Sequence, residues 1–315
     1  MIISASRRTD IPAFYSEWMI SRLRAGEVLV RNPFNKTQVS RVPLTPAAVD
    51  CIVFWTKDAG PMLPFLDELD KLGYIYYFLY TLNPYGRGIE CGFDNTECRL
   101  ETFKELSSRL GAERVIWRYD PVLITGEYDK KFHLNAFGQL AAQLSGYTRK
   151  CVFSYLEEYR KIKCNMEGIN LITPSDSLKR EIAGGMSRLS NSNSIKLTSC
   201  AVDYNFSDLG IEENRCVDDD LIEELGGGNL KVKKDPAQRK SCGCVESKDI
   251  GTYNSCRGGC LYCYANINKE AARRKSEKYN PAAPMLCDEL LGDEAVSLYK
   301  KNESPGVQNK QRELF

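Results

Sequence analysis

Short apolar runs alternate with amphipathic segments along the chain as far as about residue 199. The apolar runs predict strands at residues 1–6, 51–55, 74–81, 114–118, 150–155 and 194–199. Between them, apolar positions recur at helical spacing and predict helices at residues 14–25, 61–72, 95–110, 133–145 and 175–191. Strands joined by helical crossovers run parallel. The pattern therefore predicts an α/β fold, which we interpret as a TIM-like parallel barrel, either full or partial.

The pattern changes after residue 199. Loop-like stretches at 203–210 and 226–229 precede a polar, basic stretch at 231–240, a Cys-rich segment at 242–263 and a charged helical pattern near 266–278. We therefore expect a barrel core at 1–199 and a Cys-rich segment at 200–300 that packs on the barrel and closes over the carboxyl ends of its strands. Residues 301–315 are expected to form a polar tail.

Composition narrows the class of protein. The chain has 315 residues, and its 43 Lys and Arg balance 42 Asp and Glu, so net charge does not indicate a nucleic-acid or membrane partner. We see no signal-like apolar stretch and no run long enough to span a bilayer, and we expect a cytoplasmic, reducing location without a membrane partner. In that compartment, the 13 Cys favour metal or redox sites over disulfides, and the single His argues against His-dependent sites.

Cys256, Cys260 and Cys263 form the strongest motif, with the spacing C-x3-C-x2-C. Three thiolates ligate three irons of a 4Fe-4S cluster and leave the fourth iron open, whereas electron carriers close the cluster with a fourth cysteine. An open iron binds and activates a small molecule. Gly258 and Gly259 let the backbone wrap closely around a metal and expose its N–H groups. The alternative interpretation is a zinc knuckle that recruits one more cysteine.

A second group consists of Cys200, Cys216, Cys242 and Cys244. Four cysteines form a complete ligand set for an all-thiolate zinc site or a second iron–sulfur cluster. Alternatively, Cys200 ends a buried strand and Cys216 is a small core residue. Cys242 and Cys244 lie in small, polar surroundings that do not resemble a core.

Polar residues follow each predicted strand, at 6–10, 56–58, 81–83, 118–120, 154–155 and 198. Ligands of parallel α/β folds bind at the carboxyl ends of the strands. Four cations give this end a character suited to carboxylates or phosphates; they are Arg7, Arg8, Lys57 and Arg118. Asp120 adds a carboxylate. Each charge alone is explained by solvation of a loop, but six polar endings in succession favour a lined pocket.

With the aromatic Tyr262 just before its third cysteine, the triplet resembles the cluster loop of radical S-adenosylmethionine (SAM) enzymes. The resemblance implies a 4Fe-4S cluster on the three cysteines, SAM on the open iron, Tyr262 beside the adenine and an external electron donor. It also implies catalytic or positioning roles for Arg7, Lys57, Arg118 and Asp120.

Five motifs together resemble the bacterial family DUF1848; they are SRRTD at 6–10, VRNP at 30–33, VFWTK at 53–57, RYDP at 118–121 and DIGTYNSC at 249–256. This resemblance covers nearly the whole chain and implies a Cys-rich C-terminus like a radical SAM cluster loop, without an established reaction. A weaker similarity is to the spore photoproduct lyase group, through the Thr56-Lys57 pair and the RYDP motif.

Two hypotheses follow. The first is a radical SAM-like enzyme that acts on an unknown small-molecule or nucleic-acid substrate in the barrel. The chain departs from the usual order of such enzymes because the triplet comes last, and it has no clear Gly-Gly-Glu segment after a second strand. The second hypothesis is a binding or redox module for a nucleotide or nucleic acid, stabilised by zinc or by closed iron–sulfur clusters.

Overall fold

The structure is a computed structural model that describes residues 1–157, 160–201, 204–228 and 230–299. The predicted tail at 301–315 lies outside these residues. None of the described helices has both the length and the apolar character needed to cross a membrane.

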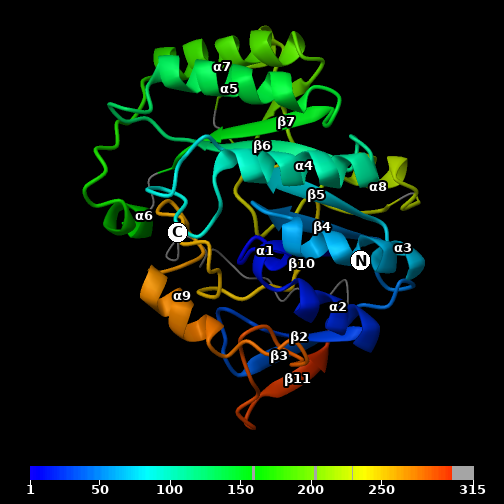
Figure 1. The fold of residues 1–315 in the computed structure, drawn as a ribbon. Coiled ribbons are helices and arrows are strands. Elements are labelled where there is room, and N and C mark those ends of the chain that lie inside the picture. Colours follow the sequence, from blue (N-terminus) through cyan, green and yellow to red (C-terminus); the bar gives the residue numbers. More distant parts are fainter. Residues whose placement is uncertain (158–159, 202–203, 229, 300–315) are drawn as a thin grey trace.

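The larger sheet has eight strands in the order β10-β1-β4-β5-β6-β7-β8-β9, and every neighbouring pair is parallel (Figure 1). Six of these strands coincide with the six predicted strands. They are β1 (Ile2–Ala5), β4 (Cys51–Thr56), β5 (Tyr76–Thr81), β6 (Val115–Val122), β7 (Lys150–Tyr155) and β8 (Lys196–Ser199). The edge strands are β9 (Glu212–Glu213) and β10 (Lys248–Asp249). The parallel α/β prediction is confirmed, whereas closure of the sheet into a barrel stays a prediction.

The helices between the strands pack on one face of this sheet and form the main core with it (Figure 1). They are α1 (Ile11–Phe14), α2 (Ser16–Ala25), the 3-10 helix η1 (Gly60–Phe65), α3 (Leu66–Lys71), α4 (Thr96–Leu110), α5 (Lys130–Leu144) and α7 (Asp176–Asn191). Two predicted helices are interrupted. The one at 14–25 starts earlier and breaks at Tyr15, and the one at 61–72 begins as 3-10 helix, where Pro64 has no backbone N–H to donate.

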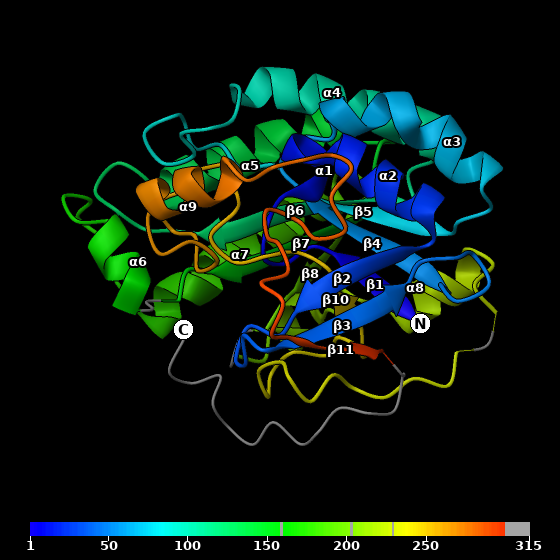
Figure 2. The same ribbon diagram turned by 90° about the horizontal axis from the view of Figure 1, so that it is seen from below.

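Several elements were not predicted. A separate three-stranded sheet joins β2 (Glu27–Arg31), β3 (Gln38–Pro43) and β11 (Ala295–Leu298) (Figures 1 and 2), and α9 (Lys269–Ser276) precedes β11 in the chain. The short helices α6 (Arg160–Asn165), η2 (Ser207–Leu209) and α8 (Asp219–Glu224) lie in the connections.

The second face of the larger sheet is covered by the chain that follows β8. Because side chains alternate along a strand, Ile2, Val53 and Leu79 point away from the helices. They form a second core with Val217 and Val245. The C-terminal part of the chain thus packs directly on the parallel sheet and contributes β10 to its edge.

Candidate cluster loop and active site

The cysteine triplet lies on the loop that follows β10. Since β10 is parallel to β1, with Ser4 opposite Asp249, this loop leaves the sheet at the carboxyl ends of the strands, where the polar residues also lie. The Asp249 carboxylate accepts hydrogen bonds from Ser4 Oγ at 3.0 Å, Ser6 Oγ at 2.8 Å and the Arg7 backbone N–H at 2.8 Å. A single buried carboxylate therefore attaches the start of the cluster loop to the end of β1.

A second attachment joins the loop to residues 86–93, which follow β5. Glu90 and Cys260 form an antiparallel bridge, and the Gly92 N–H donates to the carbonyl of Gly258 at 2.9 Å. A Cβ on Gly258 would lie 2.4 Å from Cε2 of Phe93, so only glycine fits there. Gly259 has φ +58°, in the left-handed region that glycine adopts without strain. The local geometry thus explains both glycines of the motif.

The three thiols of the triplet are close enough to interact electrostatically. Burial raises the pKa of Cys256 to about 12 and the charge of Cys263 adds to this, while backbone N–H groups of Asp10 and Gly258 oppose the rise. Burial likewise raises the pKa of Cys260, and the ammonium of Lys57 opposes it. Protonated thiols in a protein-lined pocket, with N–H donors aimed at sulfur, fit a site whose ligands lose their protons to a metal.

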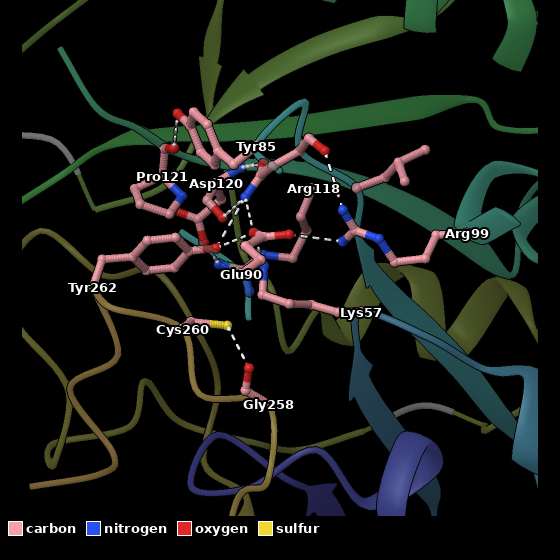
Figure 3. Close-up of polar contacts among 12 residues, drawn as sticks. Lys57, Tyr85, Glu90, Arg99, Arg118, Asp120, Pro121, Gly258, Cys260 and Tyr262 are labelled. Carbon is pink, nitrogen blue, oxygen red and sulfur yellow. Dashed lines mark hydrogen bonds and ion pairs between the residues drawn. The ribbon is translucent and has the colours of Figure 1, made fainter. Parts of the chain in front are cut away.

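Glu90 is the centre of a buried polar network beside this loop (Figure 3). Its carboxylate pairs with Lys57 Nζ at 2.8 Å and with the Arg99 guanidinium at 2.8 Å, and it accepts the hydroxyl of Tyr262. Burial alone would raise the pKa of Glu90, but the two cations lower it below its usual range. Lys57 Nζ also lies 5.3 Å from the ring centroid of Tyr262. The predicted residues Lys57 and Tyr262 are thus brought together by an acid that was not predicted.

Arg118 and Asp120, both predicted, pair with each other at the end of β6, and Asp120 also accepts the hydroxyl of Ser154. Asn83 links this pair to the Glu90 network. Its amide nitrogen donates to Glu90 at 3.0 Å and to the Asp120 carbonyl at 2.9 Å, and its amide oxygen accepts the Asp120 N–H at 2.9 Å. The polar residues at the carboxyl ends of β4, β5, β6 and β7 are therefore joined in one network of hydrogen bonds and ion pairs.

Arg7 and Arg118 lie on the ring of Trp55, each with its guanidinium carbon 5.0 Å from the ring centroid. The Tyr264 hydroxyl, from the cluster loop, donates to the Arg7 carbonyl at 2.8 Å. Burial opposes the charge of both guanidiniums, but neighbouring anions, including Asp249 for Arg7 and Asp120 for Arg118, raise their pKa. All four predicted catalytic residues thus come to the end of the sheet that carries the cluster loop.

The second cysteine group also comes together. Cys200 Sγ lies 3.5 Å from Cys216 Sγ, and Cys244 interacts with both Cys216 and Cys242. Across the described residues, no three or more His, Cys, Asp or Glu side chains are already arranged to hold a metal ion. At either group, the thiols would have to turn toward a metal as it binds.

Glu90 and Arg99 were missed because neither belongs to a motif. Glu90 lies in a polar loop and Arg99 in the amphipathic pattern of α4, where an arginine is expected to face solvent. Arg99 is instead 1% exposed and points inward to Glu90. Asp10, whose carboxylate accepts hydrogen bonds from Thr56 Oγ1 at 2.7 Å and the Lys57 N–H at 2.8 Å, and Asn83 lie within the predicted polar strand ends. Asp249 lies within the DIGTYNSC motif, but the sequence pattern predicts no role for any of the three.

A family model described as "Domain of unknown function (DUF1848)" matches residues 2–265. The matched span includes all eight strands of the larger sheet and both cysteine groups. No curated protein and no solved structure matches the chain.

Proposed function

The chain belongs to the DUF1848 family, and we propose that it is an iron–sulfur enzyme of radical SAM-like type. One observation carries the proposal. The loop with Cys256, Cys260 and Cys263 is fastened at the carboxyl edge of a parallel sheet, against a buried network of charged residues from the neighbouring strand ends. Ligands of parallel α/β enzymes bind at this edge.

The three cysteines of the triplet would hold a 4Fe-4S cluster, and its open iron would take SAM. When bound, this pair supplies radical chemistry that removes a hydrogen atom from a substrate. The cluster requires an external electron donor and reducing surroundings, which agrees with the proposed cytoplasmic location. The donor set fits the cluster, since three interacting thiols lie on a glycine-containing loop and the backbone N–H groups of Gly258 and Asp10 point at Cys256.

The protein residues of the site would position and shield the reactants. Tyr262 is fixed by its hydrogen bond to Glu90, and its ring is proposed to lie beside the adenine. Arg7 and Arg118 would bind carboxylate or phosphate groups, and Asp120 would orient Arg118. Lys57, held between Glu90 and the Tyr262 ring, is a positioning residue between the cluster loop and the substrate end of the sheet.

The position of the triplet at the end of the sequence is accounted for by the sheet order. β10 lies beside β1, so the cluster loop follows the first strand in space although it comes last in the chain. We propose that the sheet curves as a partial barrel and that this loop covers its mouth. A rearranged strand order of this kind preserves the spatial relation between cluster and barrel.

Anaerobic reconstitution with iron and sulfide tests the proposal. We expect about four irons per chain at the triplet, and release of 5′-deoxyadenosine from SAM when a strong reductant is added. Cys260→Ser should lose both. Cys98→Ser is the matched control, because Cys98 is exposed on α4 and belongs to neither cysteine group.

Two outcomes contradict the proposal. Wild-type protein that takes up iron but never yields 5′-deoxyadenosine has a cluster without SAM chemistry. Zinc in place of iron at the triplet, lost in Cys260→Ser, supports the alternative of a metal-stabilised binding module. For that module, salt-dependent binding of DNA or RNA is the next measurement.

A further inference from the structure

Four cysteines from three separate segments meet under the second face of the sheet. Cys200 directly follows β8, Cys216 lies between β9 and α8, and Cys242 and Cys244 lie between α8 and β10. Cys216, Cys242 and Cys244 belong to the second core, and Cys200 packs against it. The expectation that Cys242 and Cys244 lie outside a core was therefore wrong, because their side chains face the apolar second face of the sheet. This location differs from the loop of Cys256, Cys260 and Cys263, so the group is a second, independent set of thiols.

The sulfur atoms form a contiguous group. Cys200 Sγ lies 3.5 Å from Cys216 Sγ, Cys216 also contacts Cys244, and Cys244 contacts Cys242. Protein N–H groups donate to these sulfurs, from the Val217 backbone to Cys244 at 3.4 Å and from the Asn214 side chain to Cys216 at 3.3 Å. Donors of this kind stabilise metal-bound thiolates rather than neutral thiols.

Two half-buried cations lie near the group. Arg7 interacts electrostatically with Cys244, and Arg118 with Cys216 and Cys200. In the described part of the chain, three donors on the Trp55 stack are buried without a hydrogen-bond partner; they are Arg7 Nη2, Arg118 Nε and Trp55 Nε1. Four thiolates around a divalent ion carry a net charge of about −2, and the two guanidiniums, which also face Asp249 and Asp120, offset part of it. The surroundings thus match an anionic metal centre, which a cluster of neutral thiols would not require.

We propose that Cys200, Cys216, Cys242 and Cys244 bind a single zinc ion in a closed, all-thiolate site. The short separation of Cys200 Sγ and Cys216 Sγ favours two ligands on one metal ion over a 4Fe-4S cluster. With Zn–S bonds of about 2.3 Å, tetrahedral geometry sets the sulfurs about 3.8 Å apart, close to the 3.5 Å between Cys200 and Cys216. A 4Fe-4S cluster has one cysteine on each iron with the iron and sulfide core between them, and therefore holds the ligand sulfurs farther apart.

With four protein ligands, this zinc ion has no open position and its role is structural. The zinc ion would connect Cys200, at the end of β8, with the segment between β9 and β10 that covers the second face of the sheet. Arg7 and Arg118 stack on Trp55 and interact electrostatically with the thiol group. The zinc ion therefore also stabilises the positions of these two residues.

Metal analysis of the full chain tests the assignment. We expect one zinc ion per chain in wild-type protein, in Cys98→Ser and in Cys260→Ser, and none in Cys242→Ser or Cys244→Ser. X-ray absorption at the zinc edge should show four sulfur neighbours. The proposal for the triplet is tested separately, by measuring the iron content of Cys260→Ser and its release of 5′-deoxyadenosine.

A measurement on wild-type protein alone tests the zinc site without depending on whether the cysteine variants fold. Alkylation of the native protein followed by mass spectrometry should leave Cys200, Cys216, Cys242 and Cys244 unmodified, while Cys98 and Cys164 react. A strong chelator should then expose the four together. Iron instead of zinc at this group, loss of zinc in Cys260→Ser only, or wild-type protein without zinc after growth in zinc each overturns the proposal.

Discussion

At the scale of single residues, Glu90 determines how the cluster loop is held. Its carboxylate is 1% exposed and faces two cations, Lys57 and Arg99. Glu90→Gln keeps the shape but removes the charge, which leaves the buried Arg99 without its counter-ion. Breaking a buried pair from one side costs about 3–5 kcal/mol. We therefore expect the free energy of unfolding of metal-free Glu90→Gln, measured in urea, to be about 3–5 kcal/mol lower than that of metal-free wild-type protein.

The matched control for this prediction is Glu101→Gln. Glu101 also pairs with a cation, Lys104 at 2.9 Å, but its side chain is 71% exposed. Exposed pairs contribute about 0–1 kcal/mol, so this variant should unfold almost like wild type. Equal stability of Glu90→Gln and Glu101→Gln would show that the Glu90 network does not support the fold.

The same residue marks a limit of prediction from sequence. Lys57, Arg118 and Asp120 were found because each follows an apolar run that forms a strand, and strand ends are where parallel sheets bind ligands. Glu90 follows no such run. Its role arises from contacts with Arg99 on α4 and Tyr262 on a distant loop, and a local pattern carries no signal of contacts between distant segments.

At the scale of elements, the cluster loop depends on close backbone packing. A Cβ at Gly258 would lie 2.4 Å from Phe93, whereas a Cβ at Gly88 meets no atom within 4 Å. Gly258→Ala should therefore displace the loop, reduce iron uptake on reconstitution severalfold and speed its proteolysis. Gly88→Ala, in the segment to which the loop is attached, should match wild type in both assays. Iron uptake that is equal in the two variants would contradict the observed packing.

The elements of the larger sheet were predictable from local periodicity, whereas the local antiparallel pair β2 and β3 was missed. The six strands and their crossover helices show clear periodicity, and all six strands are confirmed. β10 has two residues, too few for a pattern, and exists because β1 offers it an edge. β11 pairs with β3, which lies far away in the sequence, and its side chains are exposed. Short strands that form only because a distant strand pairs with them could therefore not be predicted from the sequence pattern.

At the scale of the whole molecule, the barrel core predicted at 1–199 shares its packing with the rest of the chain. Ile2, Val53, Tyr77 and Leu79 form a core with side chains from beyond residue 199. The edge of β1 is likewise occupied by β10. A fragment of residues 1–199 would expose an apolar sheet face and an unpaired strand edge, two features that promote aggregation.

We therefore expect residues 1–199 expressed alone to aggregate or to lack a cooperative thermal transition, whereas the full chain unfolds cooperatively. Circular dichroism in the near ultraviolet gives the readout, because Trp18 and Trp117 are fully buried and report tertiary packing. Mixing the fragment with residues 200–315 should restore part of the signal if the missing surface is the cause. A sharp transition and a strong aromatic signal from the fragment alone would instead establish a true domain boundary at residue 199, with the Cys-rich segment as a separate layer added to a complete core.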